Sequence, residues 1–156
     1  MRMVRNVMSL VLMGMISFSF AQMSIRWMGS DGWGYGSRYD QQFSISNIQT
    51  VQGSIFRIDT ITPMSDMATG IQFTVKTDNE YILVQLGPSW YILHQDMNLR
   101  LNDPIEVKGS KVIMNGKTVI MASEIKRTGT KNVLYLRDKE GIPYWAMWRK
   151  HPILIQ

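Results

Sequence analysis

The segment IQFTVKTDNEYILVQL, residues 71–86, carries the clearest pattern within residues 49–128, the stretch that predicts the fold. Ile71, Phe73 and Val75 alternate with polar residues, and the alternation resumes at residues 82–86 after a polar turn at residues 77–80. Alternation of this kind puts every second side chain on one face of an extended chain. The segment therefore predicts two strands that each bury one face, joined by a tight turn.

Three further strands are predicted on either side of this pair. Residues 49–61 form a long first strand with Gly53 near its start, where a glycine suits a bulge or a sharp bend. The alternation at residues 105–108 begins a fourth strand, and Asn115-Gly116 predicts a type I′ hairpin that leads into the fifth.

A helix is predicted between the third and fourth strands. Pro88 suits the first turn of a helix, and Trp90, Leu93, His94 and Met97 follow at helical spacing. We expect this apolar face to fill the open end of the sheet, with Trp90 as the main contact.

Five strands with a helix after the third predict an all-β fold with one short helix. This is the order of a five-stranded Greek-key barrel of the OB type. We assign the barrel to residues 49–128 and a C-terminal β-hairpin-like extension to residues 129–156.

The residues before the barrel indicate export. Arg2 and Arg5 precede an uncharged run, and Ser19-Phe20-Ala21 offers a cleavage site, so residues 1–21 are predicted to be a signal peptide. The mature chain is then expected to be periplasmic or secreted, with no transmembrane segment after cleavage. The sequence has no cysteine, which excludes disulfides and thiolate metal sites.

Residues 22–48 interleave glycine with aromatic residues and lack the periodicity of a strand or helix. They are predicted to be a flexible tether, in which Trp33 and Tyr35 make only loose contacts.

Charge is distributed unevenly along the chain. Residues 22–99 carry four basic and seven acidic side chains, whereas residues 100–156 carry eleven basic and five acidic ones. The lysines are expected either to solvate an outer face and protect an edge or to form a patch for an anionic ligand. The candidate residues for such a patch are Lys108, Lys111, Lys117, Lys126 and Arg127.

No catalytic constellation is present in the sequence, and neither enzymatic activity nor a cofactor is expected. Met64, Met67 and His94, with Met97 nearby in sequence, offer ligands of the kind that copper accepts. The alternative is that these methionines pack in the core, which is their common role in proteins.

Several segments together resemble a family of small exported bacterial OB-fold proteins that carry generic DNA-binding or nucleic-acid-binding descriptions. The matching segments are VQG at 51–53, LGPSWY at 86–91, LNDPIEVKG at 101–109, ASEI at 122–125 and LRDKEGIPYW at 136–145. The resemblance implies the barrel fold and suggests nucleic acid as a ligand.

The favoured function is a non-catalytic periplasmic binding or adaptor module for a protein, peptide or small anionic ligand, with an envelope protein or complex as partner. Binding of single-stranded DNA is the alternative, and copper binding is a third. Nucleic acid is less favoured because Tyr81 is the only aromatic residue expected to project outward from the central strands.

Overall fold

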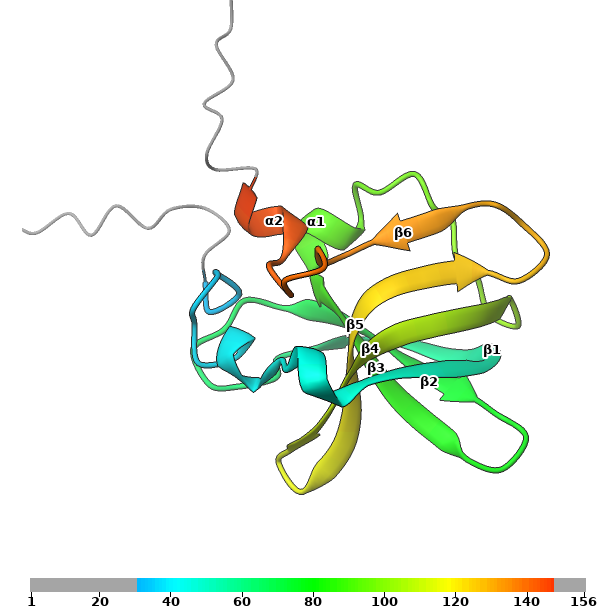
Figure 1. Ribbon diagram of the computed structural model, residues 1–156, viewed down its shortest axis with the longest axis horizontal. Helices are drawn as coiled ribbons and strands as arrows, with labels where there is room; N and C mark the ends of the chain where they lie inside the picture. Colours follow the sequence, from blue (N-terminus) through cyan, green and yellow to red (C-terminus); the bar gives the residue numbers. More distant parts are fainter. Residues whose placement is uncertain (1–30, 148–156) are drawn as a thin grey trace, which may run out of the picture.

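The computed structural model describes residues 31–147 (Figure 1). Its strands are β1 (Ile48–Ile61), β2 (Gly70–Lys76), β3 (Tyr81–Pro88), β4 (Pro104–Met114), β5 (Lys117–Arg127) and β6 (Val133–Tyr135). Its helices are α1 (Ser89–Ile92), α2 (Tyr144–Met147) and the 3-10 turns η1 (Asp40–Gln42) and η2 (Ile45–Asn47). The prediction of an all-β fold with few helices is confirmed.

Five of the strands form a closed ring. The order in the sheet is β3-β2-β1-β4-β5-β6, every one of these neighbours is antiparallel, and a short parallel pairing of β3 with β5 closes the ring. The first half of β1 pairs with β4 and the second half with β2, and Ser54 belongs to both registers. A Cβ on the neighbouring Gly53 would collide with the backbone of Lys76, so the close approach requires glycine there.

The tight turns follow the local sequence. Asn115 and Gly116 both have positive φ, at 52° and 74°, as a type I′ hairpin requires. In the turn between β2 and β3, the amide of Thr77 donates to the carbonyl of Glu80 at 2.9 Å.

Aliphatic side chains fill the ring. Ile55, Val75, Val84, Val107 and Ile125 come from five different strands, and all are fully buried. Polar residues that alternate with them, such as Lys76, Lys108 and Lys126, are exposed on the outer surface, whereas Thr74 and Gln85 are buried.

The helix that follows β3 is shorter than predicted, and its buried residue is a different one. α1 has only four residues, and Tyr91 rather than Trp90 is its buried side chain. Leu93 is 73% exposed, because the helix ends before the predicted apolar face extends over a second turn. Trp90 is only partly buried at the margin of the core.

Residues 31–47 and 136–147 pack together beside the ring, and we call them the terminal clasp. Trp33 was expected in a flexible tether, but it is fully buried, and its indole N–H donates to the carbonyl of Ala68 at 2.8 Å. Trp145 in turn donates to the carbonyl of Trp33 at 2.7 Å. Tyr35 is exposed, as expected of a loosely held side chain.

Two glycines make room for these tryptophans. A Cβ on Gly70 would collide with the ring of Trp33, and a Cβ on Gly87 would collide with the ring of Trp145. Since these glycines lie on the neighbouring strands β2 and β3, the two indoles cover adjacent positions of the sheet.

Some predictions concern parts of the chain outside the described residues. These are the signal peptide at residues 1–21, the part of the tether at residues 22–30 and the end of the C-terminal extension at residues 148–156. Within residues 31–147, no helix has the length and hydropathy needed to span a membrane.

Candidate binding surface

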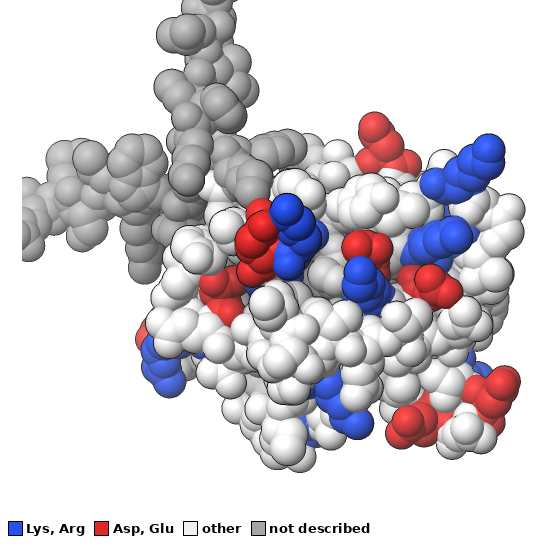
Figure 2. Space-filling model, viewed as in Figure 1, with Lys and Arg blue, Asp and Glu red and all other residues white. Residues whose placement is uncertain are grey.

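Lysines on the outer face of β4 and β5 lie opposite acidic residues. Lys108 is paired in register with Glu124, and its Nζ lies 3.5 Å from the Glu124 carboxylate. Lys126 is paired in register with Glu106. Figure 2 shows basic and acidic side chains alternating across this side of the molecule. The arrangement leaves little net positive potential for a phosphate backbone.

The remaining basic candidates lie apart from this face. Arg127 forms an ion pair with Asp103 at 2.7 Å and also donates to the carbonyl of Asn98, so it holds the loop before β4. The amide of Arg100 and the guanidinium of Arg127 hold the pKa of the Asp103 carboxyl below its usual range.

Lys111 and Lys117 are exposed near the far end of the β4–β5 hairpin. The structure therefore does not bring the five predicted basic residues together into one track.

The side chains proposed as copper ligands pack against the core or lie close to a backbone carbonyl. Met64 and Met67 pack against the core from the loop between β1 and β2, and Met67 lies directly over Gly32. His94 is exposed, and its Nδ1 lies 2.6 Å from the carbonyl of Trp90. Met97 packs against the core from the loop after α1. Within residues 31–147, no cluster of three or more His, Cys, Asp or Glu residues has the geometry of a metal site.

A hollow of about 650 Å³ lies between the terminal clasp and the outer face of β4 and β5, and we call it the clasp hollow. Its charged residues are three basic and three acidic ones: Lys108, Arg137, Lys139, Glu124, Asp138 and Glu140. Ser123 and the larger side chains of Phe43, Ile45, Ile48, Tyr135 and Tyr144 complete the lining. The hollow thus combines apolar surface with balanced charge.

A buried ion pair supports this hollow. Arg137 is 3% exposed, and its Nη1 donates to Asp40 at 2.6 Å and to the carbonyl of Gly141 at 2.8 Å. The guanidinium also lies over the ring of Phe43, 4.4 Å from its centroid. The second carboxylate oxygen of Asp40 accepts from the amide of Gly36 at 2.8 Å. The pair therefore joins the two halves of the clasp.

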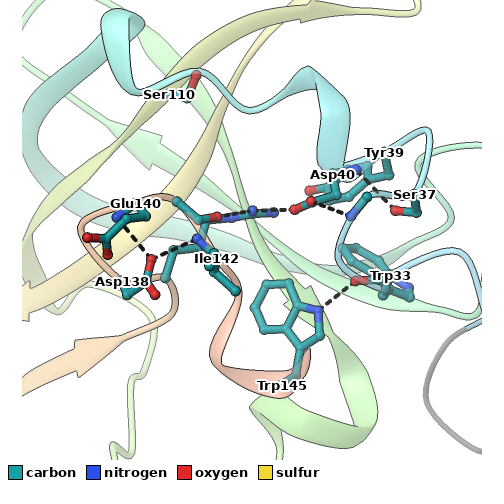
Figure 3. Close-up of polar contacts among 12 residues, drawn as sticks. Trp33, Ser37, Tyr39, Asp40, Ser110, Asp138, Glu140, Ile142 and Trp145 are labelled. Atoms are coloured by element: carbon teal, nitrogen blue, oxygen red, sulfur yellow. Dashed lines mark hydrogen bonds and ion pairs between the residues drawn. The ribbon is translucent and has the colours of Figure 1, made fainter. Parts of the chain in front are cut away.

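The loop that follows Arg137 is fixed by its own side chains (Figure 3). Asp138 Oδ1 accepts from the amides of Glu140 and Ile142, at 3.0 and 2.8 Å. Gly141 has a φ of 85°, and a Cβ there would collide with Phe43. One wall of the clasp hollow is thus held by hydrogen bonds within its own loop.

Ser110 and Tyr39 attach the clasp to the strands. Ser110 is fully buried on β4, and its Oγ accepts from the amide of Ser44 at 3.0 Å. The hydroxyl of Tyr39 donates to Gln85 on β3 at 2.9 Å. Burial raises the pKa of Tyr39 well above its usual range, despite the nearby cation of Arg137.

Of the residues that line the clasp hollow, sequence reasoning named only Lys108 as a candidate for binding. It missed the others, because contacts such as that between Arg137 and Asp40 join segments 97 positions apart. It also missed Phe56, whose ring lies 4.9 Å from that of Tyr81 on the outer surface. A bulge between Ile55 and Arg57 places Phe56 there. Two adjacent apolar residues, Ile55 and Phe56, interrupt the alternation and were the available signal for that bulge.

Comparison with known protein families gives a match over the residues that form the ring. Residues 47–132 match the model of the MamS/MamX magnetosome protein family. The chain belongs to this family. The predicted resemblance to nucleic-acid-binding OB-fold proteins was wrong, since the matching family is a magnetosome family. No curated protein shows significant similarity to the chain.

Proposed function

We propose that this chain is a non-catalytic binding module that associates with other magnetosome proteins after export to the periplasm. Membership of the MamS/MamX magnetosome protein family supports the choice of partner. The clasp hollow is the observation that carries the proposal, because exposed apolar side chains, a hydrogen-bonded wall and balanced charge coincide there.

The composition of the hollow favours a protein partner. Protein interfaces typically combine an apolar or aromatic centre with a polar rim. Here Ile45 and Tyr135 supply exposed apolar surface, and the Lys108–Glu124 pair and the exposed Lys139–Glu140 pair lie around it. A small anion would find each cation close to a carboxylate, so a peptide surface with both polar and apolar groups fits better.

The chain offers matched residues for a test. Ile45 and Ile113 are 63% and 75% exposed, and Tyr135 and Tyr81 are 54% and 56% exposed, but only the first of each pair lines the clasp hollow. A photo-crosslinking amino acid at each position, used in the native cell, should capture another magnetosome protein from positions 45 and 135. Positions 81 and 113 should give little or none of that product.

Charge substitutions complete the test. Ile45→Glu should reduce the cross-link formed from position 135 at least tenfold, whereas Ile113→Glu should leave it unchanged, with both variants folded by circular dichroism. Equal capture from all four positions, or capture of nucleic acid alone, would contradict the proposal.

A further inference from the structure

β6 has an open edge beside the clasp hollow. It lies outside the closed ring and pairs only with β5, through Val133, Leu134 and Tyr135. Among the described residues, no strand pairs with its other edge. An edge of this kind can accept a further strand.

The hydrogen-bonding groups at this edge can be assigned from the pattern of the ladder. The amide of Leu136 donates to the carbonyl of Ser123 on β5 at 2.8 Å. Amides alternate in direction along an antiparallel strand, so that of Leu134 also points to β5, and those of Val133 and Tyr135 point away from it. No turn or loop within residues 31–147 forms a backbone hydrogen bond to Val133 or Tyr135.

Two further hollows lie at β6. One, of about 440 Å³, lies between β6 and the loop after α1 and is lined by Asp96, Met97, Lys131, Asn132, Val133 and Tyr135. The other, of about 340 Å³, has no charged residue in its lining, which includes Leu134 and Leu99. Met97 lines both, so the uncharged hollow adjoins the strand edge.

These hollows set the chemistry of an added strand. Leu134 is buried and faces inward, whereas Tyr135 faces outward. The residue of an added strand that lies beside Leu134 would point in the same direction, toward the uncharged hollow. An aliphatic side chain fits there, because a charged one would lose its hydration without gaining a partner.

We infer that β6 binds an extended peptide segment of a partner protein, which adds a strand at the Val133–Tyr135 edge and places an aliphatic side chain in the uncharged hollow. This inference rests on the proposed function and names the form of the partner. Main-chain bonds supply part of the affinity in this mode of recognition, and the side-chain pocket supplies specificity. The outer positions of the segment carry polar residues, in keeping with the presence of both Asp96 and Lys131 in the lining at the edge.

The probe is a phage-displayed library of random heptapeptides selected on the purified mature chain, followed by synthesis of the enriched sequences. We expect aliphatic residues at alternate positions in these sequences. Val133→Pro removes the outward amide at an edge position, where strands tolerate proline, and should weaken binding at least tenfold. Val133→Thr retains the amide and the branched shape and should change binding less than threefold. Met97→Lys should weaken binding to a similar degree, with Met97→Leu as its control.

Amide hydrogen exchange provides a readout that does not depend on how well a variant folds. The bound peptide should slow exchange at Val133 and Tyr135 in the unmodified chain and leave Leu134, already bonded to β5, unchanged. An empty selection, unchanged exchange at these two amides, or a dimer paired through β6 would each overturn the inference. If Ile45→Glu weakened peptide binding and Val133→Pro did not, the inference about β6 would be overturned, but the proposed function would stand. Loss of the position-specific cross-links would instead refute the proposed function.

Discussion

The ring and the terminal clasp are stabilised in different ways. The ring, β1 to β5, consists of long antiparallel pairings around an aliphatic core. The clasp has only short helical turns, and it depends on two indoles, one buried ion pair and a few side-chain bonds to the sheet. The family match covers the ring and ends before β6 and the C-terminal half of the clasp. The clasp hollow, which is the surface proposed for binding, lies between the clasp and the ring and so extends beyond the residues that the family match covers.

The difference predicts that single side chains matter more in the clasp. In a strand ladder, many backbone hydrogen bonds contribute to stability, and removal of one outer side chain breaks none of them. In the clasp, the large buried side chains contact several others. Trp33 alone lies 4.6 Å from Tyr39 and 6.3 Å from Trp145, measured between ring centroids.

The largest effect is expected at Trp33. Trp33→Ala should lower the free energy of unfolding by about 3–5 kcal/mol, because it leaves a cavity over Gly70 and removes the bond to Ala68. Urea unfolding followed by circular dichroism measures the change. Tyr35→Ala, at an exposed position two residues away, should change it by less than about 0.5 kcal/mol. Equal effects would mean that the clasp is not packed as described.

A somewhat smaller effect is expected at the buried ion pair. Arg137→Met should cost about 3 kcal/mol, the lower end of the usual range, because Asp40 keeps some contact with solvent and a bond from Gly36. Adding Asp40→Asn should recover part of this loss, since the neutral amide no longer needs a cation. Lys139→Met, in an exposed pair with Glu140, is the control and should change stability by less than about 1 kcal/mol.

The hydroxyl of Tyr39 makes the clasp sensitive to alkali. Its pKa is raised by burial, so the folded chain retains a proton that the unfolded chain releases above about pH 10. The stabilisation is fully present below that pH and is lost as the pH rises further. Unfolding midpoints measured between pH 8 and 11.5 should therefore fall, and Tyr39→Phe should reduce the slope above pH 10. An unchanged slope in Tyr39→Phe would assign the alkaline loss to other groups.

The sequence could predict the ring because its signals are local. Alternation over six residues identifies a strand, and Asn115-Gly116 identifies the hairpin that pairs β4 with β5. The clasp has no such signal, because the partner of Trp33 is Trp145, 112 positions away. Glycines around Trp33 and Tyr35 suggested a tether, although the glycines that make room for the indoles are those of β2 and β3.

The candidate binding surface shows the same limit. The lysines of β4 and β5 were correctly recognised as outward residues, but their effect depends on which residues lie opposite. The register that pairs Lys108 with Glu124 was not part of the sequence reading. Charge summed along the chain therefore indicated a basic half, whereas on the sheet Lys108 and Lys126 lie in register with glutamates. Figure 2 shows basic and acidic side chains interspersed on one side of the molecule.

The smallest effect on stability, with a clear effect on binding, is expected when the two glutamates that face Lys108 and Lys126 are replaced by lysine. Glu106→Lys with Glu124→Lys should change the free energy of unfolding by less than about 1–2 kcal/mol, since exposed charge pairs contribute little. The unmodified chain should not bind single-stranded oligonucleotides at about 150 mM salt, where exposed charges are screened beyond about 8 Å. The variant presents four lysines on two neighbouring strands and should acquire weak binding.

A control with the same change in charge separates this effect from net charge. Asp78→Lys with Glu80→Lys adds as much positive charge in the turn between β2 and β3, away from the lysines of β4 and β5, and should bind much more weakly. Fluorescence anisotropy across a salt series should give the sheet variant a slope of about −0.7 per phosphate contacted. Because alternation with acidic residues is proposed to prevent a phosphate track on this face, tight binding by the unmodified chain would remove the electrostatic argument for a protein partner.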